Sequence, residues 1–155
     1  MDSIKWCLNQ RRGIELVEPN DNLQKAYISK AEDSLETLQT SRNKDWKLTA
    51  AYYTIYQGIY SILMKIGIKC EIHSCTIEFT KKFLGDYFNL ENIELIEIAS
   101  SARIDAQYYV NRKVPDKNYS LILEKTPEFL VKCKNLTITP SEIKKIRAKI
   151  LSLSR

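Results

Sequence analysis

The sequence contains one histidine, His73, and this limits the acid–base and metal chemistry open to the chain. Sites that need several histidines, either to hold a metal ion or to exchange protons in a pair, are excluded. Cys70, His73 and Cys75 provide three soft ligands within six residues, but no fourth ligand is near and the spacing matches no zinc motif. We therefore predict no metal site and no cofactor. The alternative to metal binding is a structural role, in which His73 caps or hydrogen-bonds the start of a helix.

Arg103 is the residue that most strongly indicates a binding site. Helical spacing places its permanent positive charge on the apolar seam of a helix, where burial without a partner would cost several kcal/mol. The partner is either a carboxylate from another helix or a phosphate held between helices or subunits. Tyrosines gather on the same helix and on the long helix before it: Tyr52, Tyr53, Tyr56, Tyr60, Tyr108 and Tyr109. Core packing and stacking on a nucleobase both fit these tyrosines.

The C-terminal segment is a second candidate site because it is strongly basic. Residues 141–155 contain five basic residues and one acidic residue, in a chain whose net charge is +5. The candidate nucleic-acid contacts are Lys144, Lys145, Arg147 and Lys149. The alternative is the solvated face of a docked helix, because apolar residues recur on the opposite face.

Sequence strings that mark common enzymes are absent. The chain contains no G-x-x-x-x-G-K-[ST], G-x-G-x-x-G, H-E-x-x-H or G-x-S-x-G. Glu91, Glu94 and Glu97 follow one another at three-residue steps, but acids at the start of a helix favour its dipole and fit a solvated first turn. We leave catalysis open and favour a non-enzymatic function.

Helices must position these residues, because apolar residues recur at three- and four-residue steps in every long segment. We predict an all-α fold: one up-and-down bundle of about five core helices within residues 21–134, followed by a basic amphipathic helix within 137–155. The expected core helices span about 21–39, 45–66, 74–84, 90–111 and 116–133. The helix 45–66 is apolar around most of its circumference, which predicts a central place in the bundle or cover from a second subunit.

Individual residues predict where these helices begin, end and cross. Asp21, Ser74 and Asp116 are expected N-caps, and residues 139–142 form a capping box with proline at the first helical position. Gly67 suits the left-handed end of a helix, and Gly58 predicts a close helix crossing. Residues 68–73 are expected to be a short polar link. Pro127 predicts either a kink or a break, with Thr126 capping a new helix.

Composition limits the class of protein. The 155 residues correspond to one domain, and 44% hydrophobic with 28% charged residues excludes a disordered or collagen-like chain. No signal peptide and no membrane span are recognisable. The four cysteines form no CxxC pair, so we expect free thiols in a reduced, cytoplasmic setting.

Four strings, in order, resemble the small prokaryotic HEPN proteins (higher eukaryotes and prokaryotes nucleotide-binding domain). They are AYYTIYQG at 51–58, MKIGIK at 64–69, HSCT at 73–76 and RIDAQYY at 103–109. The resemblance implies a helical bundle, usually a homodimer, often encoded beside a minimal nucleotidyltransferase in toxin–antitoxin or defence operons. Many members are metal-independent ribonucleases with an Arg-x(4-6)-His motif. That motif is missing here, because the arginine nearest before His73 is Arg42.

These observations predict a HEPN-like module that associates with a nucleotide or RNA and partners a nucleotidyltransferase-like protein. Five residues are expected to line its cleft, without assigned catalytic roles: Arg103, Tyr109, Tyr52, Lys69 and His73. One alternative is a metal-independent endoribonuclease toxin in which Arg103, His73 and a tyrosine act from different helices. Another is a purely structural helical interaction protein.

Overall fold

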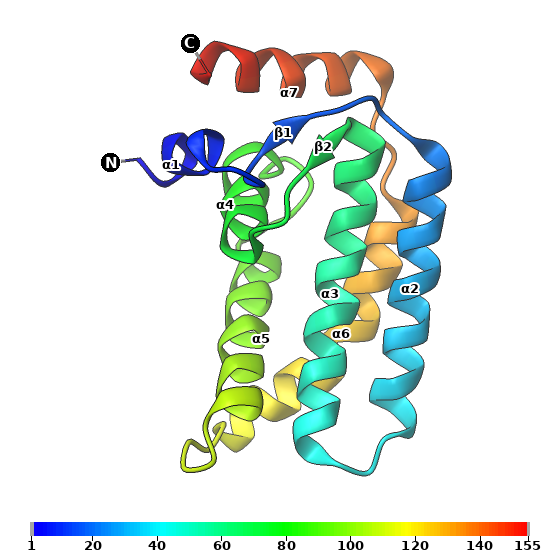
Figure 1. Cartoon of the computed structure of the whole chain (residues 1–155). Helices are drawn as coiled ribbons and strands as arrows, with labels where there is room; N and C mark the ends of the chain where they lie inside the picture. The colour runs from blue at the N-terminus through cyan, green and yellow to red at the C-terminus, as the bar shows by residue number, and fades with distance from the viewer. Residues whose placement is uncertain (1, 155) are drawn as a thin grey trace.

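The structure, a computed structural model, describes residues 2–154 and confirms the all-α prediction. Arg155, counted in the basic tail, lies outside the described residues. The long helices α2 (Asp21–Thr40), α3 (Lys44–Ile66), α5 (Leu90–Tyr108) and α6 (Asp116–Asn135) run up and down beside one another (Figure 1). The remaining helices are α1 (Ser3–Asn9), α4 (His73–Phe83) and α7 (Pro140–Leu153). No helix among residues 2–154 has both the length and the apolar character needed to cross a membrane.

Helix α3 is the centre of the bundle, as its nearly continuous apolar surface predicts. It packs against α2, α5 and α6, and its residues are buried along most of its length. Asn43 caps its first turn by accepting a hydrogen bond from the Trp46 amide. Gly67 ends it in the left-handed conformation, with a φ of 88°, which confirms the prediction for this glycine.

Gly58 marks a close approach of α3 to α6. A Cβ atom at this position would lie 3.1 Å from the Cys133 Sγ atom and 3.7 Å from a Leu130 methyl group, both on α6. The predicted close crossing is confirmed, and α6 is the helix that crosses.

The N-terminal segment adds structure that the sequence analysis did not predict. Strand β1 (Glu15–Leu16) pairs antiparallel with strand β2 (Ile68–Lys69), with Glu15 opposite Lys69. The expected polar link after α3 therefore begins with a strand. Strands of two residues show no alternation that could reveal them in a sequence.

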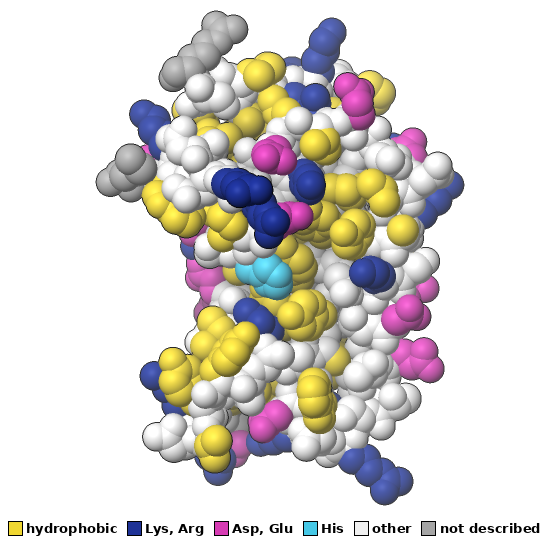
Figure 2. Space-filling view, in the orientation of Figure 1, with side chains coloured by type: hydrophobic (Ala, Val, Ile, Leu, Met, Phe, Trp, Pro, Cys, Tyr) yellow, Lys and Arg dark blue, Asp and Glu magenta, His cyan; other side chains and the backbone are white. Residues whose placement is uncertain are grey.

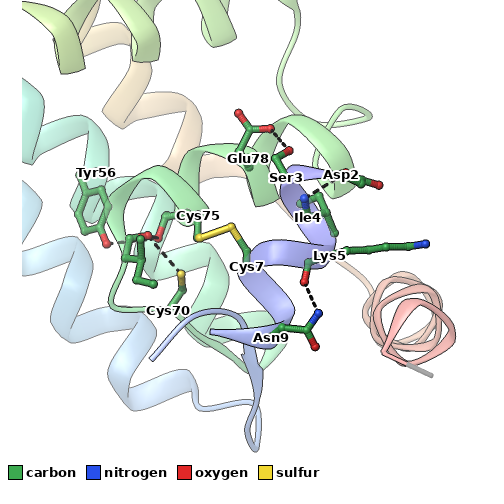
Figure 3. The surroundings of a disulfide bond; sticks show 12 residues. Asp2, Ser3, Ile4, Lys5, Cys7, Asn9, Tyr56, Cys70, Cys75 and Glu78 are labelled. Atoms are coloured by element: carbon green, nitrogen blue, oxygen red, sulfur yellow. Dashed lines mark hydrogen bonds between the residues drawn. A yellow bond between two sulfur atoms is a disulfide. The ribbon is translucent and has the colours of Figure 1, made fainter. Parts of the chain in front are cut away.

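A disulfide joins Cys7 of α1 to Cys75 of α4 (Figure 3). The prediction of free thiols was therefore wrong for these two cysteines. Cys70 and Cys133 are free and buried. Beside the disulfide, the Ser3 hydroxyl donates a 3.0 Å hydrogen bond to the Glu78 carboxylate, so α1 lies firmly against α4.

Several predicted helix ends were wrong by a few residues. Helix α4 begins at His73 with Ile72 as N-cap and no side-chain cap, so Ser74 is not the cap. Asp21 and Asp116 are each the first residue of their helix, and α5 ends at Tyr108, before the expected 111.

Helix α6 continues through Pro127, so the predicted break with a new cap at Thr126 was wrong. The Thr126 hydroxyl instead donates to the Ile122 carbonyl, within the same helix. The proline thus lies inside one helix of twenty residues.

Helix α7 lies across one end of the bundle (Figure 1). Thr139 caps it as predicted, by accepting a hydrogen bond from the Glu142 amide, and Ile146 and Ile150 are buried beneath it. The Arg147 guanidinium donates 2.8 Å hydrogen bonds to the carbonyls of Val17 and Gly67. The predicted docked helix is confirmed, and Arg147 is one of the residues that dock it.

Candidate functional site

Three of the predicted cleft residues, carried by three different helices, meet in one cluster. The Arg103 Cζ atom of α5 lies 4.5 Å from the centroid of the Tyr52 ring of α3. The Tyr52 hydroxyl in turn lies 2.7 Å from the Nδ1 atom of His73, the first residue of α4. We call these three residues the Arg103–Tyr52–His73 cluster.

Aromatic residues hold the His73 ring. Tyr56 stacks on it at a centroid distance of 4.1 Å and an angle of 16°, and Tyr52 and Tyr56 lie one turn apart on the same face of α3. The Tyr56 hydroxyl lies 3.3 Å from the Thr76 hydroxyl, one turn into α4. The Cys70 amide donates to the Tyr60 hydroxyl over 3.0 Å, which fixes the chain just before α4. Tyr52, Tyr56 and Tyr60, on three successive turns of α3, thus hold the start of α4 and the residues just before it.

His73 is half-buried, and its electrostatic surroundings favour the neutral imidazole. Burial lowers its pKa below the ordinary value, and the charge of Arg103 lowers it further. Burial also raises the pKa of Tyr52 to about 12, so the hydroxyl that meets Nδ1 keeps its proton at neutral pH. No residue in the described range hydrogen-bonds the Nε2 atom of His73. This nitrogen is therefore available to a ligand.

In Figure 2 the single histidine, drawn in cyan, reaches the surface beside hydrophobic and basic side chains. A ligand in solution can reach the His73 ring from this face.

Arg103 has no carboxylate partner within residues 2–154. One terminal nitrogen donates to the Gln107 Oε1 atom over 2.9 Å, while the buried Nε atom has no hydrogen-bond partner at all. The nearest acid along the helix, Asp105, pairs instead with Arg112 at 3.4 Å. The anionic partner expected from the sequence is thus not a side chain of the described protein.

The other two predicted cleft residues lie apart from these contacts. Tyr109 follows the end of α5 and is covered by the Arg112 guanidinium, 3.6 Å from its ring centroid. Lys69 lies in β2, with its Nζ atom 3.9 Å from the Glu71 carboxylate. Among the described residues, no hydrogen bond, ion pair or ring contact joins either of them to the cluster.

Two residues of the site were not among the five predicted cleft residues, and helical spacing could have added both. Tyr56 and Gln107 follow Tyr52 and Arg103 by four residues, so each shares a helix face with a residue that was predicted. A third feature had no sequence signal: the direct contact between His73 and Tyr52, which depends on how α4 packs against α3.

The basic residues of α7 divide into two groups. Lys144, Lys145 and Lys149 are exposed to solvent. Arg147 points into the protein, where backbone carbonyls accept its hydrogen bonds. In residues 2–154 no group of three or more histidine, cysteine, aspartate or glutamate side chains is arranged to hold a metal ion.

No protein-family model, curated protein or solved structure matches this chain. The chemistry of the cluster is therefore the basis for a functional assignment. It combines an unneutralised guanidinium, a neutral imidazole with one free nitrogen and a protonated tyrosine hydroxyl.

Proposed function

We propose that the Arg103–Tyr52–His73 cluster binds a phosphate group of a nucleotide or of RNA. The observation that carries this proposal is that no carboxylate of residues 2–154 neutralises Arg103, whose buried Nε atom has no hydrogen-bond partner among them. A guanidinium matches phosphate oxygens in geometry as well as in charge. Tyr52 keeps the guanidinium in place by its cation–π contact, and this contact uses none of the N–H groups.

Affinity measurements on the whole chain test this proposal. We expect wild-type protein to bind AMP and a 12-nucleotide RNA at low salt, and Arg103→Met to weaken both by at least about tenfold, since a hydrogen bond to a charged group is lost. Methionine retains the apolar stem. The matched control is Arg112→Met, which removes an exposed arginine five residues beyond Gln107 and leaves affinity unchanged.

The result that contradicts the proposal is equally specific. Failure of the wild-type protein to bind either ligand, or equal binding by a folded Arg103→Met protein, would leave the purely structural interpretation. Far-UV circular dichroism and thermal unfolding of each variant verify the fold.

Metal-independent RNA cleavage is a second candidate function. It is favoured by the contact between His73 and the Tyr52 hydroxyl, because the Arg103 guanidinium lies over the ring of the same tyrosine. The His73 Nε2 atom would take the proton of a ribose 2′-hydroxyl, whose oxygen attacks the adjacent phosphorus while the bond to the 5′-oxygen breaks. Arg103 would stabilise the developing negative charge. The leaving 5′-oxygen takes a proton from water, and the imidazolium returns its proton to the hydroxide that this leaves, which restores neutral His73. The products are a 2′,3′-cyclic phosphate and a 5′-hydroxyl end.

Incubation of RNA with the protein in EDTA separates binding from cleavage. Cleavage that persists in EDTA and disappears in His73→Ala supports the second candidate. Intact RNA after incubation with a protein that binds it leaves the binding function alone.

The resemblance to HEPN proteins extends the proposal to partners. We propose a homodimer that acts beside a minimal nucleotidyltransferase-like protein in a toxin–antitoxin or defence system. Exposed Lys144, Lys145 and Lys149 would add sequence-independent phosphate contacts at the end of the bundle. Sedimentation over a range of dilutions tests the dimer, and a single monomeric mass at all concentrations contradicts it.

A further inference from the structure

A surface pocket lies beside the cluster, between the N-terminal end of α3 and the C-terminal end of α5. Its volume is about 380 Å³. Its aromatic lining residues are Trp46 and Tyr108, and its polar ones are Asn43, Asp45, Thr49 and Gln107.

The two aromatic side chains of this pocket are unusually exposed for their size. Trp46 is 62% exposed and Tyr108 is 68% exposed, although the protein buries most of its large apolar side chains. Single exposed apolar residues need no explanation, but two aromatic rings on opposite helices that line one pocket form a surface on which a flat ligand can stack.

The pocket is connected to Arg103 through Gln107. The Gln107 side chain lines the pocket, and its Oε1 atom accepts the hydrogen bond from Arg103. On the facing helix, Trp46, Thr49 and Tyr53 follow at three- and four-residue steps and so share one face of α3. The Tyr53 ring lies 6.0 Å from the Arg103 Cζ atom. The same two helices therefore form both the pocket and the arginine site.

The polar groups of the pocket leave hydrogen-bonding capacity for a ligand. The oxygens of Asn43 and Gln107 are engaged by the Trp46 amide and by Arg103, so each side-chain amide keeps its NH₂ donors. The Asp45 carboxylate supplies acceptors. Donors and acceptors around stacking rings are the groups that recognise the edges of an unpaired base.

We propose that this pocket holds the base of a nucleotide or of single-stranded RNA whose phosphate is bound by Arg103. The inference rests on the proposed phosphate site and adds a substrate class to it: the ligand is a nucleotide unit with an unpaired base. Stacking supplies affinity, and the pocket polar groups orient the ring.

Tryptophan fluorescence provides a direct test, because the chain has two tryptophans and Trp6 lies on α1. In a Trp6→Phe background Trp46 is the only tryptophan, and excitation at a wavelength that tyrosine does not absorb reports on it alone. We expect AMP to change its emission and ribose 5-phosphate, which lacks the base, to leave it unchanged. Stacking on one base contributes about 1–3 kcal/mol, so AMP is expected to bind about 5- to 150-fold tighter than ribose 5-phosphate.

Variants assign this difference to the pocket. Trp46→Ala and Tyr108→Ala should each weaken AMP binding by about fivefold or more while ribose 5-phosphate binds as before. Trp6→Ala is the matched control, because Trp6 is exposed on a different helix, and it should change neither affinity.

The outcomes separate this inference from the proposal on which it rests. Equal, Arg103-dependent binding of AMP and ribose 5-phosphate overturns the base pocket and leaves the phosphate site. Absence of binding by both ligands overturns the two together. A dimer that dissociates in Trp46→Ala without a change in AMP affinity would assign the pocket to contact with a second copy and overturn the base pocket.

Discussion

His73 is the titratable residue of the candidate site whose charge can change near neutral pH. Its pKa is lowered first by burial against α3 and then by the positive charge of Arg103. Both effects disfavour the imidazolium, so the ring is neutral at neutral pH. In the tautomer whose Nδ1–H donates to the Tyr52 hydroxyl oxygen, Nε2 can accept a proton or a hydrogen bond. Arg103 thus lowers the pKa of His73, in addition to the phosphate binding that we propose for it.

Removal of the arginine charge tests this coupling. We expect Arg103→Met to raise the His73 pKa toward its ordinary value, because one of the two causes of the lowering is lost. The single histidine makes its NMR titration unambiguous. Arg112→Met is the control and should leave the His73 pKa as it is. An unchanged or lower His73 pKa in Arg103→Met would show that the charges are not coupled.

The same lowered pKa has a consequence for stability. The unfolded chain binds a proton at His73 at a higher pH than the folded protein does. The free energy of unfolding is therefore insensitive to this residue above the unfolded pKa of about 6.5, and it falls as the pH drops from there to the folded pKa. Arg103→Met should reduce this acid sensitivity.

At the scale of elements, the disulfide between Cys7 and Cys75 determines how the N-terminal segment is held. It joins α1 to α4 across a sequence separation of 68 residues. Its α4 cysteine, Cys75, lies two positions after His73. Helix α1 has only seven residues and would be unstable alone, since short helices depend on tertiary contacts. The cross-link therefore stabilises both the segment and the start of the helix that carries His73.

Reduction of this disulfide should lower the free energy of unfolding by about 2–4 kcal/mol, because the cross-link restricts the unfolded chain. Urea denaturation with and without a reductant measures the difference. Cys7→Ser is the control: its stability should equal that of the reduced wild type and should not respond to the reductant. Four reactive thiols in unreduced, denatured protein, instead of two, would show that the bond does not form.

The free cysteines should not interfere with this measurement in the native state. Burial raises the pKa of both the Cys70 and the Cys133 thiol, so neither forms the reactive thiolate readily. Cys133 also packs against the Gly58 crossing of α3 and α6.

At the scale of the whole molecule, α7 joins the C-terminal part of the chain to the segment after β1 and to the end of α3. Arg147 donates to the carbonyls of Val17, which follows β1, and of Ile66 and Gly67, at the end of α3. A cation at this position satisfies carbonyls that the end of a helix leaves free and favours the helix dipole. One basic residue of the tail, Arg147, therefore has a structural role.

Arg147→Met should lower the free energy of unfolding by about 1.5–3 kcal/mol, the usual contribution of hydrogen bonds from a charged group. Lys144→Met, on the exposed face of the same helix, is the matched control and should change stability by no more than about 0.5 kcal/mol. Urea denaturation of the two variants measures both. Equal stability of Arg147→Met and the wild type would mean that apolar packing alone docks α7.

Much of the helical framework was predictable from the sequence. Apolar spacing predicted the long helices, Gly67 and Thr139 predicted an end and a start, and Gly58 predicted the crossing that α6 makes. Local sequence also singled out Arg103 as a cation on an apolar seam. These features depend on residues within one or two helical turns, which is the range over which periodicity and capping act.

Tertiary structure alone decided the rest. The sequence separation is 21 residues between Tyr52 and His73 and 68 between Cys7 and Cys75. Whether such residues meet depends on the direction and rotation of each helix in the bundle, which no local pattern encodes. For the same reason, only the packing of the helices determines that no carboxylate of residues 2–154 pairs with Arg103, the observation on which the proposed phosphate site rests.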